Sequence, residues 1–156
     1  MKPTFFRTAA AFRQWLQEHN ATQQELLVGF YKIESGKPSI SWPESVDEAL
    51  CFGWIDGIRK RVDDVSYTIR FTPRKPASVW SSINIKRVEA LVAEGRMTPS
   101  GLKAFANRRA NKSGIYSYEQ RPDQLVEPYA GLLASNARAS KFFTQQAPSY
   151  RRAAIP

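Results

Sequence analysis

The chain contains 156 residues, of which 42% are hydrophobic and 24% are charged, and it carries a formal net charge of +9. These proportions are typical of one globular domain and exclude an intrinsically disordered, collagen-like or low-complexity chain. One cysteine and one histidine exclude an internal disulfide bond and a cysteine cage for zinc, so we expect no metal and no other cofactor. The positive charge favours an acidic partner: a nucleic acid, an anionic membrane surface or an anionic small molecule.

The N-terminal segment lacks the features of a secretion signal, because Arg7, Arg13 and Gln14 interrupt its apolar residues. No stretch elsewhere approaches the ~18 consecutive apolar residues that a membrane-spanning helix needs. We therefore expect a soluble, cytoplasmic protein without a membrane span. The sequence indicates no particular oligomeric state.

The first third of the chain predicts two helices with a strand between them. Thr8 is placed to cap a helix that carries a stripe of apolar residues at helical spacing. Residues 25–33 are rich in β-branched and aromatic side chains, which favours a buried strand. Ser41 and Glu44 then have the spacing of a capping box, and Gly53 is a suitable residue to end the helix that follows.

Residues 55–72 alternate in character on both sides of Asp63-Asp64, which predicts a β-hairpin. With any even-length loop centred there, apolar side chains share one face with two opposite charges, and basic side chains occupy the other. The first face would carry Asp56, Ile58, Lys60, Val62, Tyr67, Ile69 and Phe71, and the second Arg59, Arg61, Thr68 and Arg70.

Further helices are predicted to begin at Ser81 and at Thr98-Pro99, followed by short helical pieces near residues 129–134 and 138–146. Strands and helices do not alternate as a parallel sheet requires. We therefore expect an α+β fold, in which a small antiparallel sheet with a central β-hairpin is covered by helices on one face. Residues 1–112 would form this core domain, and residues 113–156 a mainly helical segment packed on it.

The excess charge is concentrated in residues 51–112, which carry 13 Lys or Arg and 5 Asp or Glu. Within them, the basic loop that contains Arg74 and Lys75 precedes the helix that starts at Ser81. The N–H groups of a helix N-terminus can hold an anion together with basic side chains. The alternative is ordinary capping by Ser81 beside a solvated loop. The predicted anion-binding residues are Arg70, Arg74, Lys75, Trp80, Ser81, Asn84 and Arg87.

A nucleic-acid-binding module is a second hypothesis. The stripe of Arg59, Arg61 and Arg70 could neutralise phosphates, extended by the basic loop, while aromatic side chains nearby stack on bases. The alternative is a solvated basic face with the aromatic residues in the core. The aromatic residues concerned are Trp54, Tyr67, Phe71 and Trp80.

A small-molecule enzyme is a third hypothesis, so whether the protein is an enzyme stays open. Asp56 would be a general base and Lys60 would stabilise negative charge, with Trp54 and Tyr67 as pocket walls. The alternative is that the strand begins after Asp56 and that Lys60 extends to solvent. Cys51 reads as an inert core thiol, and no G-x-S-x-G elbow or phosphate-binding P-loop occurs.

Residues 5–110 include "VDEALCFGWIDG" and "RFTPR" followed by "WS", and this part of the chain closely resembles the YdeI/OmpD-associated (bacteriocin-protection) family. The later "FFTQQAPSYRR" resembles the start of that family's C-terminal segment, which usually continues with a further basic helix, so the resemblance implies a shortened or truncated C-terminus here. It also implies a role in stress or bacteriocin protection, acting indirectly from the cytoplasm. It implies no catalytic residue and no cofactor.

Overall fold

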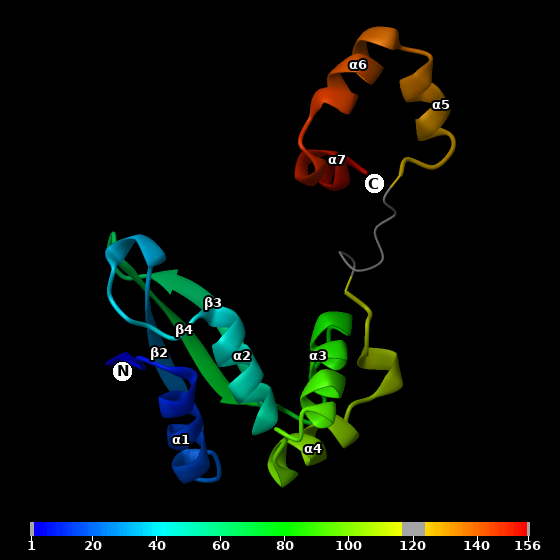
Figure 1. Cartoon of the computed structure of the whole chain (residues 1–156). Coiled ribbons are helices and arrows are strands. Elements are labelled where there is room, and N and C mark those ends of the chain that lie inside the picture. The colour runs from blue at the N-terminus through cyan, green and yellow to red at the C-terminus, as the bar shows by residue number, and fades with distance from the viewer. Residues whose placement is uncertain (1, 117–123, 156) are drawn as a thin grey trace. The chain divides into compact units, whose positions relative to one another are not determined.

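A computed structural model describes residues 2–116 and 124–155 of the chain. It is an α+β structure, with a four-stranded sheet and helices in the first part and helices alone in the second (Figure 1), as predicted. The chain divides into two compact units, Met1–Ser113 and Gly114–Pro156. This division lies one residue beyond the predicted boundary, and the packing of the second unit on the first stays a prediction.

The elements of the first unit follow one another in an irregular order of strands and helices. They are β1 (Thr4–Phe5), α1 (Ala9–His19), β2 (Leu26–Tyr31), the 3-10 turn η1 (Ile33–Ser35), α2 (Trp42–Cys51), β3 (Trp54–Arg61), β4 (Ser66–Pro73), α3 (Ser82–Ala93), α4 (Pro99–Ala106) and the 3-10 turn η2 (Ala110–Lys112).

Local capping explains where the helices of the first unit begin. The side-chain oxygens of Thr8, Ser41, Ser81 and Thr98 each accept a hydrogen bond from the backbone N–H three residues later. At Ser41 the capping box is complete, because the Glu44 carboxylate accepts a hydrogen bond from the backbone N–H of Ser41. All four predicted helix starts are therefore confirmed.

The sheet has the strand order β1-β2-β4-β3. The hairpin β3–β4 and the pair β2–β4 are antiparallel, with Leu26 opposite Phe71, as expected for this part of the sheet. Strand β1 was not predicted and pairs with β2 in parallel, with Thr4 opposite Val28. Two residues are too few to show any alternation in the sequence, so this strand depends on tertiary pairing alone.

A β-bulge in β3 changes which side chains share a face of the sheet. Asp56 pairs with Phe71 and Arg59 pairs with Ile69, so two residues, Gly57 and Ile58, lie opposite one residue of β4. The extra residue reverses the alternation for the rest of the strand. The predicted face assignment is therefore wrong for β3 beyond Asp56, where Ile58 is 79% exposed instead of buried, whereas the assignment for β4 is confirmed.

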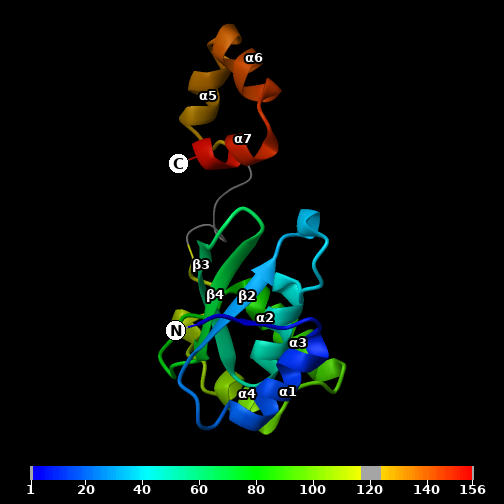
Figure 2. The same ribbon diagram turned by 90° about the vertical axis from the view of Figure 1, so that its left-hand side faces the viewer.

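The core lies between the sheet and the helices. Figure 2 looks onto the sheet, with β3, β4 and β2 side by side and α2 and α3 behind them. From α1, Phe12 packs edge-on against Phe71 with ring centroids 5.4 Å apart, and Trp15 packs edge-on against Trp54 at 5.8 Å. Burial of these large rings supplies the main favourable term for folding of the first unit.

A buried carboxylate joins the helices to one another. Glu48 of α2 is 4% exposed, and its two oxygens lie 2.8 Å from Arg13 Nη1 of α1 and 2.7 Å from Arg96 Nη2, just after α3. Burial works against ionisation of both arginines, but their hydrogen bonds to carboxylates and the charge of Glu48 outweigh it and raise the pKa of each. Cys51 lies beside this group, and burial raises the pKa of its thiol, as expected for an inert core cysteine.

The second unit consists of three short helices, α5 (Tyr129–Ala134), α6 (Ala137–Gln145) and α7 (Pro148–Ala154). The first two match the predicted helical pieces, whereas α7 was not predicted. Its N-cap residue, Ala147, makes no side-chain capping bond, so the usual polar signal for a helix start is missing. Among the residues described in this unit, Ile155 is the one buried hydrophobic side chain.

The Glu48 network yields a prediction about stability. Glu48→Gln keeps the shape of the side chain but leaves two partly buried arginines without their shared charge, so we expect the free energy of unfolding to fall by about 2 kcal/mol. The fall stays below that of a fully buried pair because the Arg13 and Arg96 side chains are 28% and 33% exposed. Urea unfolding followed by circular dichroism measures it. The control Glu94→Gln removes a half-exposed partner of Arg96, and an equal loss in both variants would contradict the central role of Glu48.

Candidate functional site

The predicted anion-binding loop is organised around Arg74. Its guanidinium lies 3.6 Å from the centre of the Trp80 ring, and Nη1 donates hydrogen bonds to Ser78 Oγ at 3.3 Å and to the Val79 carbonyl at 3.2 Å. Trp80 itself is 2% exposed, so its ring supports the arginine and offers no surface to a ligand. Lys75, the next residue, is exposed.

The structure does not bring the other predicted residues into that loop's surface. Arg87 Nε and Nη2 donate hydrogen bonds to the two carboxylate oxygens of Asp47 at 2.6 and 2.7 Å. These hydrogen bonds raise the pKa of Arg87 above its already high usual value. Arg70 pairs with Glu25. Ser81 is nearly buried and its oxygen accepts the N–H of Asn84, so the first turn of α3 is already capped by its own side chain.

A later part of the chain, which sequence reasoning missed, returns to this loop. The backbone N–H of Trp80 donates to the Lys112 carbonyl at 2.9 Å, and Lys112 Nζ donates to the Ala77 carbonyl at 3.1 Å. The Phe105 ring packs edge-on against Trp80 at 5.4 Å, and the Arg108 guanidinium lies 3.8 Å from the centre of the Phe105 ring. Two basic segments therefore meet around one buried tryptophan.

We call Arg74, Lys75, Arg108, Arg109 and Lys112 the basic corner. Residues 65–88 and 95–116, which supply it, contain five Lys or Arg each and no Asp or Glu. Within the described ranges, Lys75, Arg108, Arg109 and Lys112 form no ion pair. The acid-free run 95–116 was the signal in the sequence that could have identified the second half of this surface.

A second candidate site is a groove at the opposite end of β4. Two cavities of about 260 and 880 Å³ share Trp42, Arg59 and Tyr67 in their walls, and we call them together the Trp42 groove. The other walls come from η1 and the chain around it, and from β3 and β4. The groove lies where the hairpin extends past the start of α2, so the helix covers only part of this face.

Side chains in the Trp42 groove are held in place by one another. The Trp42 indole is 50% exposed, and its Nε1–H donates to Asp56 Oδ2 at 2.9 Å. The Arg59 guanidinium lies 3.6 Å from the centre of the Tyr67 ring, and Tyr67 in turn stacks on buried Phe30 with ring centroids 5.0 Å apart. The smaller cavity therefore presents an aromatic surface, one carboxylate and one guanidinium.

This arrangement corrects the predicted Asp56–Lys60 site. Asp56 and Tyr67 do line a pocket, but the bulge turns Lys60 toward Thr68 on the opposite face of the sheet and places Arg59 in the pocket instead. Trp54 is 1% exposed and is a core residue, so Trp42 supplies the wall that was assigned to Trp54. An acid–base pair of Asp56 and Lys60 is excluded by this register.

The predicted nucleic-acid face is also changed by the structure. Arg59 and Arg61 pair with Ile69 and Tyr67, whereas Arg70 lies on the other face, so the three arginines do not form one stripe. Trp54, Phe71 and Trp80 are buried in the core, as the alternative interpretation predicted. Bases therefore cannot stack on Trp54, Phe71 or Trp80. Tyr67 is the one partly accessible ring of this set, and it lies half-buried beneath Arg59.

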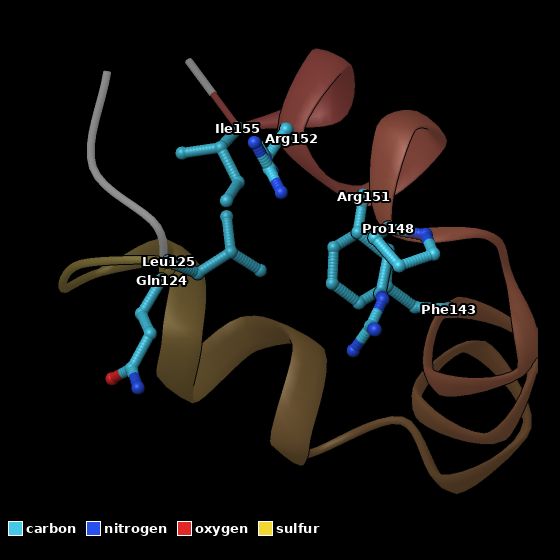
Figure 3. A pocket seen from close by; sticks show the side chains of 7 residues that line it. All are labelled: Gln124, Leu125, Phe143, Pro148, Arg151, Arg152 and Ile155. Carbon is cyan, nitrogen blue, oxygen red and sulfur yellow. The ribbon is translucent and has the colours of Figure 1, made fainter. Parts of the chain in front are cut away.

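A third cavity, of about 440 Å³, lies within the second unit (Figure 3). The side chains of Leu125 and Ile155 point toward one another across it, and Phe143 lies beside Pro148. Arg151 also lines this cavity and gives it basic character. Neither the basic corner nor the Trp42 groove contributes a residue to it.

The capping box that positions Trp42 yields a pH prediction. Hydrogen bonds from the hydroxyl and the backbone N–H of Ser41 hold the pKa of Glu44 below its usual value. The ionised carboxylate therefore stabilises the fold at neutral pH, and this contribution is lost as the pH falls through the carboxyl's pKa. We expect Glu44→Gln to lower Tm by about 1–2 °C at pH 7, and this difference should shrink progressively as the pH falls below the usual pKa of a glutamate and vanish at strongly acidic pH. Thermal unfolding at several pH values tests this, and a difference that persists at low pH would contradict it.

Comparison with known proteins places the chain in a family. No curated protein and no solved structure matches it. No helix in the described part of the chain is long and apolar enough to cross a membrane. One family model matches residues 4–104, a range that contains the whole sheet, α1 to α3 and most of α4. Because this match covers more than half of the chain, the protein belongs to the family described as a domain of unknown function, DUF8412.

Proposed function

We propose that this protein binds a polyanion through its basic corner and that the polyanion is a nucleic acid. One observation carries the proposal: two chain segments without a single acidic residue meet at Trp80, and together they present five cations. Cations on chain segments that contain no acidic residue raise the local positive potential and attract phosphates.

The cations of the basic corner are partly fixed before any ligand arrives. Arg74 lies over Trp80, Arg108 lies over Phe105, and Lys112 is bonded to the Ala77 carbonyl. Side chains that are already ordered lose less conformational entropy on binding. This order supports a binding role, because a merely solvated basic face needs no such support.

An extended polyanion suits this surface better than a small anionic molecule, which is the second candidate ligand. Small-molecule sites bury most of their ligand in a pocket, and none of the three cavities described above is lined by a residue of the basic corner. Phosphates along a nucleic acid backbone can reach separate cations on an open surface. We expect binding that depends strongly on salt and little on base sequence.

The test uses two double variants with the same change in net charge. Lys75→Ala with Arg109→Ala removes two exposed cations of the basic corner, and Lys2→Ala with Arg7→Ala removes two exposed cations near the N-terminus. We expect the first pair to weaken binding to duplex DNA and to reduce the slope of log K against log salt by about 1 for each lost phosphate contact, as measured by filter binding. The second pair should bind nearly as the natural chain does.

Two results would overturn the proposal. Equal losses in both double variants would show that net charge alone drives association. No detectable binding at low salt would remove nucleic acid as the ligand.

The biological setting that we propose comes from the resemblance to the YdeI/OmpD-associated family: stress or bacteriocin protection, exerted from the cytoplasm. A chain with a net charge of +9 repels cationic peptides, so protection would be indirect and not by sequestration. We expect a bacterium that expresses the chain to survive a cationic bacteriocin better than one that expresses the Lys75→Ala, Arg109→Ala variant. Equal survival would separate any protective role from the basic corner.

A further inference from the structure

We infer that the Trp42 groove is a second ligand site and that it binds a nucleoside monophosphate whose base carries N–H donors, such as guanine. The proposal rests on the groove's shape, its exposed indole and the placement of its charges. It is independent of polyanion binding, because the groove and the basic corner share no residue.

The size of the groove suits such a ligand. Its larger cavity, of about 880 Å³, falls in the range of small-molecule sites, which is roughly 300–1,000 Å³, and the smaller one, of about 260 Å³, lies just below it. The smaller cavity is lined by Trp42, Asp56, Arg59 and Tyr67, and the larger one opens toward η1. A flat ring in the smaller cavity would therefore leave room for an attached sugar and phosphate in the larger one.

Trp42 is an unusual residue to leave exposed. Half of its side-chain surface meets solvent, while Trp54 and Trp80 are 1% and 2% exposed. The hydrogen bond from its Nε1–H to Asp56 holds the ring in one orientation, so a ligand that stacks on it does not have to order it first. Stacking on an aromatic side chain is how proteins bind nucleobases that are not in a duplex.

Three cations favour an acidic group on the ligand. Arg59 is shared by both cavities and is held over Tyr67, while Lys32 and Lys37 line the larger cavity. Lys37 Nζ lies 4.9 Å from the centre of the Tyr31 ring, which places its charge at the wall of this cavity. Glu34 offsets one of these charges, so the larger cavity fits a single phosphate better than a long polyanion.

Asp56 adds a requirement at the ring end. Its Oδ2 accepts the hydrogen bond from Trp42, and no described residue donates to its Oδ1. A carboxylate accepts hydrogen bonds and has none to donate, so it favours a base edge that carries N–H groups and repels one that carries only oxygen acceptors. Guanine, with two neighbouring N–H donors on one edge, meets this requirement better than uracil, whose single N–H lies between two carbonyl oxygens.

The experiment is a titration of the full chain with GMP, in which binding is measured by calorimetry and by tryptophan fluorescence. We expect saturable binding with a change in emission, because Trp42 is the one exposed tryptophan: Trp15 is half-buried, and Trp54 and Trp80 are buried. Trp42→Ala should weaken GMP binding by about tenfold, as the loss of one stacked base does. Arg59→Gln should weaken it by a similar factor and should reduce the preference for GMP over guanosine, because one of the three cations near the phosphate is lost. Circular dichroism checks that each variant is folded.

Matched controls keep the test specific. Arg61→Gln removes an exposed cation two residues from Arg59 that lines neither cavity, and it should leave GMP binding unchanged. Asp56→Asn supplies an amide that donates as well as accepts, so the preference for GMP over UMP should fall. The Lys75→Ala, Arg109→Ala variant should keep full GMP affinity, which separates this proposal from polyanion binding.

Several outcomes would overturn the inference. They are the absence of binding at millimolar GMP, equal affinity for GMP, guanosine and inorganic phosphate, and equal affinity of the natural chain for GMP and UMP. A loss of GMP binding in the basic-corner variant would also overturn it, since that result would place the nucleotide at the other site.

Discussion

The arrangement of helices over the sheet depends on one buried carboxylate. Glu48 ties Arg13 of α1 to Arg96 after α3, and Arg96 is tied in turn to Glu94 at the end of α3. A buried carboxylate without a paired cation would be costly, so these ion pairs fix α1, α2 and α3 relative to one another over the aromatic rings that cover the sheet. The same interaction decides where the positive charge of the protein is available, because arginines that neutralise buried or half-buried acids contribute little to the field outside. Within the described ranges, Lys75, Arg108, Arg109 and Lys112 of the basic corner form no ion pair, so their charges contribute to that field.

Much of the fold could be predicted because its signals are local. Each N-cap acts over a few residues, and apolar periodicity marks the helices and the β2–β4–β3 part of the sheet. The bulge was not predictable in this way, because Gly57 and Ile58 continue the alternation of the strand in the sequence. Whether a bulge forms there depends on pairing with β4, which the sequence of β3 alone does not show. The one extra residue places Arg59 in the groove in place of Lys60.

The candidate sites show the same division between local and long-range information. Arg74, Lys75 and Trp80 are neighbours in the chain, and their clustering could be predicted. The return of residues 105–112 to that loop could not, nor could the carboxylates of Asp47 and Glu25, which hold two arginines that had been assigned to the anion site. Trp42 was visible only as a residue in the first turn of a helix. Its exposure follows from how far the hairpin extends past α2, which is a property of the assembled sheet.

The position of β3 gives its basic residues a further consequence. In the order β1-β2-β4-β3 this strand lies at an edge, and an edge strand offers its backbone hydrogen-bonding groups to any other extended chain. The bulge distorts this edge, and the consecutive charges of Arg59, Lys60 and Arg61 repel a second copy of the same strand. These three residues thus oppose pairing of this edge with the same strand of a second copy, whatever ligand the groove holds. A variant in which all three charges are neutralised would associate more readily with other copies through this edge strand.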